Sequence, residues 1–153
     1  MSTYEATVAW QIKEGESFET RKYSRGHRWT FDGGADVPAS ASPAVVGTTY
    51  SDPAGVDPEE ALVAALASCH MLFFLDLASR SGINVTSYVD HAVGHVGKRD
   101  DGVVAMLSAT MRPKITYASP TDPVKVTALH HKAHELCYIA NSVNFPVTVD
   151  EGA

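Results

Sequence analysis

The chain has 153 residues, of which 44% are hydrophobic and 20% are charged. These values are ordinary for a globular protein, so we expect a single domain spanning residues 1–153. The 12 basic residues are outnumbered by 18 acidic residues, and the net charge of -6 leaves no positive excess to neutralise phosphate or anionic lipid. The composition therefore argues against nucleic acid and against a membrane surface as partners.

The N-terminal stretch MSTYEATVAWQIKEGE lacks the basic segment and following apolar region of a signal peptide. We therefore expect a cytoplasmic protein. The chain has two cysteines. In a reducing compartment, a cysteine pair is more often catalytic, metal-binding or simply buried than a permanent disulfide. The sequence thus poses the question of which of these three roles the two cysteines have.

Short strands are predicted for the N-terminal part, from residue 4 to about residue 42. YEATVAWQI alternates in polarity, and HRWTF is rich in aromatic and β-branched residues. The DGG sequence at residues 32–34 indicates a turn, so a hairpin is expected here. The segment from Pro38 to Pro58, which is rich in Pro, Ser, Gly and Ala, is expected to be a loop.

A helix is predicted to begin at Asp57-Pro58-Glu59-Glu60. Asp57 is expected at the N-cap and Pro58 at the first helical position, while Glu60 completes a capping-box pattern. The apolar run continues to about Ser79 and is apolar around nearly its whole circumference between residues 61 and 77. We expect a buried central helix, too short and too polar to span a bilayer.

Two alternating segments follow, at residues 87–96 and 103–117, and the charged turn KRDDG joins them into a predicted antiparallel hairpin. Asp122-Pro123 begins a second helix that is expected to reach about Val143, and residues 146–150 form a closing strand. This order of elements predicts an α+β fold with helices packed against antiparallel sheet.

Cys69 lies more than two turns inside the first predicted helix. One interpretation is a core cysteine, because free cysteine is among the most buried residue types. A reactive cysteine would need a nearby cation to hold the thiolate, and residues 59–79 contain neither Lys nor Arg. The best supply elsewhere is RKYSRGHR, at residues 21–28, whose arginines could equally be a solvated strand end. The residues alone leave both interpretations open.

The stretch DPEEALVAALASCHMLFFLDLASRSGI, followed about seventy residues later by a second cysteine within HKAHELCYIANSV, resembles the OsmC/Ohr family. The names stand for osmotically inducible protein C and organic hydroperoxide resistance protein. The resemblance covers essentially the whole chain. It implies a single OsmC-like domain that forms an intertwined homodimer, with antiparallel sheets around two long helices and active sites at the subunit interface.

The resemblance also implies roles for individual residues. Cys69 would be the peroxidatic cysteine and Cys137 the resolving cysteine, and the two would form a redox-active disulfide. Glu59 would orient a guanidinium, and Arg25 would supply that guanidinium, with Arg28 as the nearest competitor. On this interpretation the arginine stabilises the thiolate and the negative charge that develops across the peroxide bond.

Two residues depart from well-known members of the family. Tyr138 follows the second cysteine where a proline is usual, which affects the expected geometry of Cys137. His70 stands where an aromatic residue is usual, and it is expected to alter the rim of the pocket.

The function that the resemblance implies is an antioxidant, thiol-dependent peroxidase that reduces organic hydroperoxides during oxidative stress. Its partner would be a dithiol reductant, for which the family suggests a lipoyl-type system, and no cofactor or metal is expected. An apolar wall on the first helix would favour an organic hydroperoxide over hydrogen peroxide. Its expected members are Leu66, Met71, Leu72 and Phe73.

Two other functions remain open from the sequence. His130, His134 and Cys137 have the i, i+4, i+7 spacing that places side chains on one helical face, and all three are competent zinc ligands. They would make a metal-binding protein. The third possibility is a non-enzymatic dimeric stress or ligand-binding protein that uses the same pocket.

Overall fold

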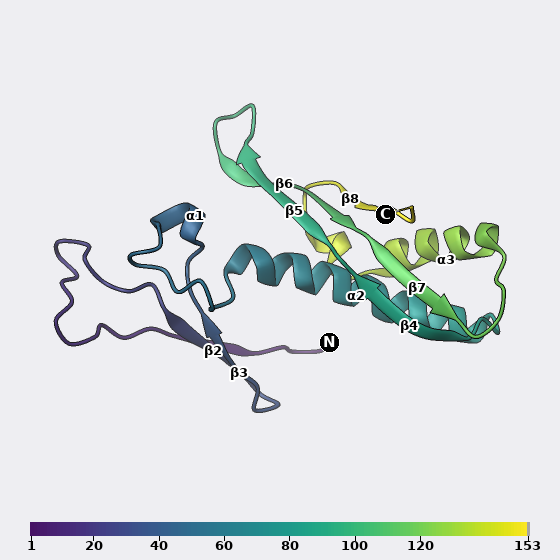
Figure 1. Ribbon diagram of the computed structural model, residues 1–153, viewed down its shortest axis with the longest axis horizontal. Helices are drawn as coiled ribbons and strands as arrows, with labels where there is room; N and C mark the ends of the chain where they lie inside the picture. The colour runs from purple at the N-terminus through teal and green to yellow at the C-terminus, as the bar shows by residue number, and fades with distance from the viewer. Residues whose placement is uncertain (153) are drawn as a thin grey trace. The chain divides into compact units, whose positions relative to one another are not determined.

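The computed structural model describes residues 1–152 (Figure 1). The chain forms two compact units, Met1–Ala61 and Leu62–Ala153. The first unit contains three strands and a short helix, and the second contains most of the long helix α2, the remaining strands and helix α3. Helices and antiparallel strands together confirm the predicted α+β class.

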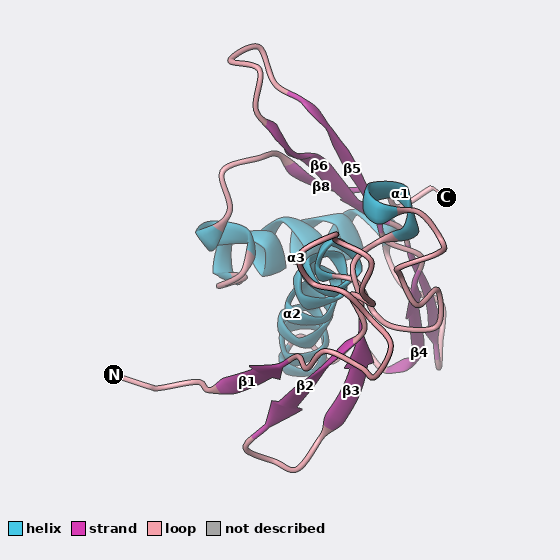
Figure 2. Ribbon diagram, turned by 90° about the vertical axis from the view of Figure 1, so that its left-hand side faces the viewer, coloured by secondary structure: helices cyan, strands magenta, loops and turns pink. Residues whose placement is uncertain are grey.

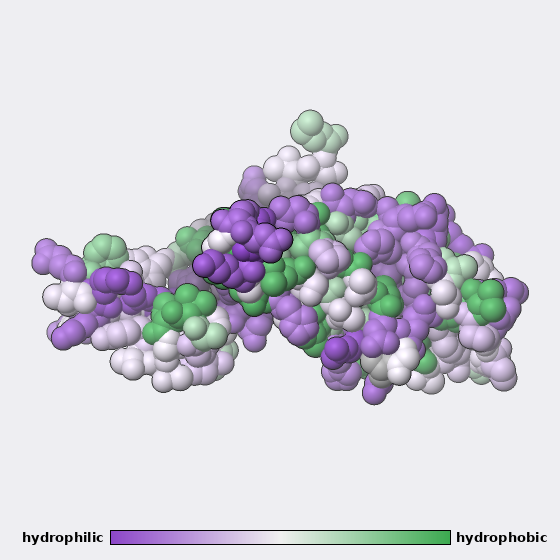
Figure 3. Space-filling model, turned by 90° about the horizontal axis from the view of Figure 1, so that it is seen from above, coloured by the Kyte–Doolittle hydropathy of each residue, from purple (hydrophilic) through white to green (hydrophobic). Residues whose placement is uncertain are grey.

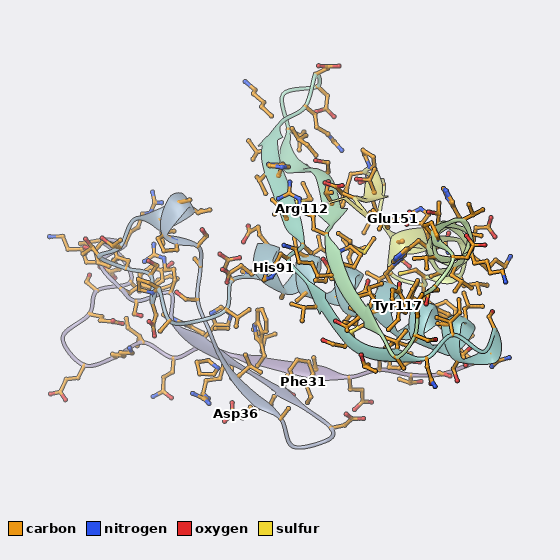
Figure 4. The ribbon with its side chains drawn as sticks, turned by 45° about the vertical axis from the view of Figure 1, so that its right-hand side comes forward. Phe31, Asp36, His91, Arg112, Tyr117 and Glu151 are labelled. Atoms are coloured by element: carbon orange, nitrogen blue, oxygen red, sulfur yellow. The ribbon has the colours of Figure 1, made fainter. Side chains whose placement is uncertain are left out.

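The first unit is built on a three-stranded antiparallel sheet in the order β1-β2-β3. Its strands are β1 (Ala6–Ala9), β2 (His27–Phe31) and β3 (Asp36–Ala39). The predicted DGG turn joins β2 to β3, and Phe31 and Asp36 mark its two sides in Figure 4. Gly34 takes φ 84° there, a left-handed conformation that favours glycine. The predicted hairpin is confirmed.

The predicted loop before the long helix contains a short helix, α1 (Pro43–Val46). Ser42 caps it by accepting a hydrogen bond from the Ala44 N–H, and Pro43 occupies the first helical position. Ser40 is fully buried, and its hydroxyl accepts a hydrogen bond of 2.8 Å from the Asp52 N–H. The segment is therefore more ordered than the sequence indicated.

Helix α2 (Pro58–Arg80) begins with the predicted capping box. The Glu60 N–H donates to the Asp57 carboxylate at 2.8 Å, and the Asp57 N–H donates to the Glu60 carboxylate at 3.1 Å. These two bonds satisfy amide groups that the first turn of a helix leaves without partners. The start of α2 is thus where the sequence predicted it.

The buried face of α2 is a single stripe with a spacing of four residues: Leu66, His70, Phe74 and Ala78. In the core, Phe74 and Ala78 form a cluster with Ala133 of α3. We expected this helix to be buried on every side. Within a single chain this expectation is wrong, because Leu72 is 61% exposed.

Within residues 1–152, α2 is the one helix whose length and composition would allow it to cross a membrane. The sequence-based view that it is too short and too polar is therefore wrong, since the helix runs on to Arg80. Core helices of soluble proteins meet the same criteria, so this property is weak support for a membrane span.

The predicted hairpin of the second unit is present, and its first arm is longer than expected. Its first arm is β4 (Val85–Asp90) followed by β5 (Val93–Lys98), and its second is β6 (Val104–Met111) followed by β7 (Pro113–Tyr117). β4 pairs with β7 and β5 pairs with β6, both antiparallel. Both arms are interrupted at the same level, where His91 and Arg112 lie (Figure 4).

A glycine in this hairpin marks its closest approach to the long helix. A Cβ atom at Gly94 of β5 would lie 2.5 Å from a methyl group of Val63 in α2 and 2.9 Å from the sulfur of Met106. Only a residue without a side chain fits between these two neighbours. Gly94 therefore allows β5 to approach α2.

Helix α3 (Pro123–Leu136) begins as predicted, with Asp122 at the N-cap, but it ends earlier than expected. The sequence placed its end near Val143, whereas Cys137 already leaves the helix and a 3₁₀ turn, η1, follows at Ala140–Ser142. The last strand, β8 (Val147–Val149), pairs in parallel with β6. Figure 2 shows the helices and strands separately coloured.

Candidate functional site

The two cysteines meet in the second unit, and both are free thiols. Cys69 is half-buried on α2, while Cys137 is completely buried where α3 ends. Burial is the main cause that raises the pKa of the Cys137 thiol to about 11, and the neighbouring Cys69 thiol raises it further. The structure therefore places the thiols of Cys69 and Cys137, which the family resemblance pairs, close to one another.

Cys137 lies in a turn that several hydrogen bonds hold. The Ala140 N–H donates to its sulfur at 3.4 Å. The Asn141 side-chain amide donates to the Glu135 carbonyl at 2.9 Å and to the Cys137 carbonyl at 3.0 Å. Sequence reasoning did not single out Asn141. No signal in the sequence marked it, because the predicted helix ran past Asn141 to about Val143.

Arg25 belongs to the first unit, and its guanidinium lies against an aromatic ring. The guanidinium carbon is 3.7 Å from the centre of the Tyr23 ring and 5.6 Å from that of Tyr50. Its Nη1 donates to the Tyr23 carbonyl and, at 3.3 Å, to the Arg21 carbonyl. These contacts use one nitrogen of the planar fork and leave the others available for an anion.

A cavity of about 420 Å³ lies beside Arg25 in the first unit. Three aromatic residues that pack on one another, Trp10, Phe18 and Tyr23, form much of its wall. The indole N–H of Trp10 donates to the Ser24 carbonyl at 2.8 Å. The cavity therefore combines an apolar surface with a single guanidinium.

Arg28, the predicted competitor of Arg25, already has an anionic partner. Its Nε donates to the Asp36 carboxylate at 2.7 Å across the β2–β3 hairpin. Both side chains are about half exposed, and this hydrogen bond raises the pKa of Arg28. Arg25 has no such partner, because none of the salt bridges among residues 1–152 includes it.

Glu59 is half-buried at the start of α2, and one of its carboxylate oxygens is buried without a hydrogen-bond partner in the described part of the chain. Such an oxygen normally has a donor, because an unsatisfied buried acceptor is costly. Within residues 1–152, no ion pair joins Glu59 to Arg25. The structure therefore shows a carboxylate that still requires a donor.

His70 lies in the core and not at a pocket rim, which corrects the expectation from the sequence. It is fully buried, and its Nε2 lies 3.0 Å from Nδ1 of His130, which is also buried. Burial lowers the pKa of His70 to about 4, and His130 and His134 add repulsion of the charged form. Leu66, expected in the apolar wall of a pocket, is likewise a core residue.

The three residues of the alternative metal site do not come together as one. Within residues 1–152, no group of three or more His, Cys, Asp or Glu side chains is arranged to hold a metal ion. The helical spacing on which the site depended ends before Cys137, which lies at the C-cap of α3. His130 is instead engaged with His70.

Comparison with known proteins identifies relatives across the chain. The family model for OsmC-like protein matches residues 51–152. An OsmC-like protein of unknown function from Vibrio cholerae is 45% identical, with a TM-score of 0.94 and coverage of 98% of this chain and 99% of that chain. None of the curated proteins matches the chain.

Two more distant structures share the fold. An organic hydroperoxide resistance protein from Elizabethkingia anophelis has a TM-score of 0.72 at 18% identity, and covers 98% of this chain and 96% of its own. An organic hydroperoxide resistance protein from Bacillus subtilis has a TM-score of 0.65 at 20% identity, with 97% of both chains covered. With the family model matching two thirds of its length, the chain belongs to the OsmC-like protein family.

Proposed function

We propose that the protein is a thiol-dependent peroxidase that reduces organic hydroperoxides, with Cys69 as the peroxidatic cysteine and Cys137 as the resolving cysteine. The observation that carries the proposal is the proximity of the two thiols, since Cys69 is close enough to Cys137 to raise the pKa of its thiol. The half-buried Cys69 is the one open to a substrate, while the buried Cys137 is placed to react next. Membership of the OsmC-like family and the shared fold with organic hydroperoxide resistance proteins support it.

In the first step, the Cys69 thiolate attacks one oxygen of the peroxide bond. That bond breaks, the alcohol leaves after taking up a proton, and Cys69 becomes a sulfenic acid. In the second step, Cys137 attacks the Cys69 sulfur, and a disulfide and one water are formed. An external dithiol, for which we propose a lipoyl-type compound, returns the disulfide to two thiols.

Arg25 and Glu59 are the proposed partners of the first step. The free nitrogens of the Arg25 fork suit both a thiolate and the developing charge on a peroxide oxygen. The buried Glu59 oxygen that lacks a donor suits a guanidinium, which would hold the fork in place. Because Arg28 already forms a salt bridge with Asp36, we propose Arg25 and not Arg28 as the arginine that activates Cys69.

The active form is proposed to be a homodimer. Large apolar side chains of the second unit remain exposed in the chain by itself, including Leu72 at 61%, Val104 at 68% and Tyr138 at 71%. Hydrophobic residues also lie among the polar ones on the surface shown in Figure 3. Exposed apolar surface of this kind is typical of subunit interfaces.

The test is a peroxidase assay that compares cumene and tert-butyl hydroperoxide with hydrogen peroxide, using dihydrolipoamide or dithiothreitol as the reductant. We expect turnover of both organic substrates and slower turnover of hydrogen peroxide, because the part of α2 that carries Cys69 is rich in apolar side chains. The Cys69→Ser variant should be inactive. Equal rates for the wild type and this variant would overturn the proposal and favour a binding protein.

A further inference from the structure

The main chain of Cys137 is fixed by one side chain, that of Asn141. The amide nitrogen of Asn141 donates both to the Glu135 carbonyl and to the Cys137 carbonyl. The backbone N–H of Asn141 donates to the same Cys137 carbonyl at 3.0 Å. One residue therefore holds Cys137 through its main chain and its side chain and ties it to the last turn of α3.

These hydrogen bonds supply a donor to a carbonyl group at the end of a helix. The last four carbonyls of a helix have no partner within the helix, and Glu135 is among them in α3. An asparagine side chain has two N–H donors, which is the number used here. Asn141 thus closes the helix and sets the direction in which the Cys137 side chain leaves it.

The same turn aims a backbone donor at the reactive atom. The Ala140 N–H lies 3.4 Å from the Cys137 sulfur, and this contact lowers the pKa of Cys137 against the larger effect of burial. Because Ala140 immediately precedes Asn141, a turn that loosens at Asn141 would also misplace this donor. The turn therefore controls both the position and the ionisation of the thiol.

We propose that Asn141 is a positioning residue for disulfide formation, an inference that rests on the proposed function of Cys69 and Cys137. Asn141 acts through Cys137 and does not touch the peroxide. It holds the Cys137 sulfur toward Cys69 and keeps the Ala140 N–H on that sulfur. The Cys137 thiolate then attacks the oxidised Cys69 sulfur, the S–S bond forms, and hydroxide leaves and is protonated to water.

Three variants of Asn141 distinguish the effect of its hydrogen bonds from the effect of its packing. Asn141→Asp keeps the shape of the side chain but has no N–H to donate, whereas Asn141→Ala removes both shape and donors. Asn141→Ser keeps a single donor. Asn144 is the matched control, because it is exposed and its side chain makes no hydrogen bond among residues 1–152.

The experiment follows two reactions by rapid mixing with cumene hydroperoxide: formation of the Cys69 sulfenic acid, trapped with dimedone, and formation of the disulfide. We expect Asn141→Asp and Asn141→Ala to slow disulfide formation by about tenfold or more and to leave sulfenic acid formation within about twofold. Their disulfide-formation rate should also rise at higher pH than in the wild type, because the Ala140 donor is lost. Asn144→Ala should change neither rate.

A second arm with diamide removes the dependence on peroxide chemistry. Diamide accepts one thiolate, and the second thiol then displaces the resulting hydrazine to form the disulfide. A wild type that makes no sulfenic acid with peroxide refutes the peroxidase, while the diamide rates still test Asn141. Disulfide formation at the wild-type rate in both Asn141→Asp and Asn141→Ala overturns the inference. Should both variants unfold, Asn141→Ser decides, with an intermediate rate expected and an unchanged rate contradicting the proposal.

Discussion

His70 of α2 and His130 of α3 are joined by a hydrogen bond between two buried imidazoles. The bonded nitrogens are 3.0 Å apart, and the rings are parallel within 5°. His130 also stacks on Phe74, with ring centres 4.2 Å apart. The other nitrogen of His70 is buried without a partner in the described part of the chain. The hydrogen bond that links the two helices therefore requires at least one of the two imidazoles to be neutral.

The first prediction is that this pair makes the protein sensitive to acid. Burial lowers the pKa of His70 from 6.5 to about 4, and burial also lowers the pKa of His130, although Glu151 opposes that shift. Below pH 6.5, these two histidines therefore bind protons more readily in the unfolded chain than in the folded chain. Stability should be full above pH 6.5 and should decrease as the pH falls toward 4, by roughly 3 kcal/mol from His70.

Urea unfolding between pH 7 and pH 4 measures this effect. His70→Phe removes the titrating group and keeps an aromatic ring, so its stability should depend less steeply on pH than that of the wild type. His131→Gln is the control, because His131 is on the same helix but is exposed. Parallel pH profiles for the wild type and His70→Phe would contradict the prediction.

The second prediction concerns the reversible disulfide. One equivalent of cumene hydroperoxide should convert the wild type to a Cys69–Cys137 disulfide, with the loss of both free thiols. In Cys137→Ser, the reaction should stop at the sulfenic acid, which dimedone labels stoichiometrically. Mass spectrometry of the intact protein and of its peptides distinguishes these products. Two free thiols in the treated wild type would rule out the resolving role of Cys137.

The third prediction separates the two arginines. Arg25→Ala should slow the reaction of Cys69 with cumene hydroperoxide by about a hundredfold, which is typical when one donor to a developing negative charge is removed. Arg28→Ala should stay within about twofold, since Arg28 pairs with Asp36 on the protein surface. Stopped-flow kinetics under single-turnover conditions gives both rates. A larger loss in Arg28→Ala would reverse the two roles.

The fourth prediction tests the start of α2. Asp57→Ala removes the acceptor for the Glu60 N–H and should lower the free energy of unfolding by about 1 kcal/mol. Glu60→Ala should lower the free energy of unfolding by less than Asp57→Ala does, because it leaves the Asp57 carboxylate in place at the N-cap. Thermal unfolding of both variants, compared with Glu19→Ala at an exposed loop position, provides the measurement. Equal stability of Asp57→Ala and the control would show that the capping box contributes nothing.

The features that the sequence predicted well are those that depend on neighbouring residues. The capping box at Asp57 and Glu60 and the turn around Gly34 each need only a few consecutive side chains. The end of α3 was predicted too late because VTALHHKAHELCYIANSV contains no glycine or proline to mark a stop. In the structure, the side-chain amide of Asn141 donates to the carbonyl of Glu135 in place of a helical N–H group. The hydrophobic periodicity of the sequence does not reveal this hydrogen bond.

The arrangement of the candidate site depends on contacts that are distant in the sequence. His70 and His130 are 60 residues apart, and the burial that sets their pKa values exists only after α2 has packed on α3. The pairing of Cys69 with Cys137 followed from family resemblance, because no spacing rule connects two cysteines so far apart. The buried Glu59 oxygen without a partner was likewise not visible from the sequence.

The parallel pairing of β8 with β6 has a consequence for how the chain folds. Thr110 and Thr148 meet through their hydroxyls at 3.1 Å, although 38 positions separate them. All of α3 and the Cys137 turn lie within this loop, so β8 can dock only after a large loss of chain entropy. Contacts of such long sequence separation form slowly. During synthesis and refolding, the hairpin arm containing β6 therefore keeps an open edge until β8 docks on it, and this edge is where early aggregation should start.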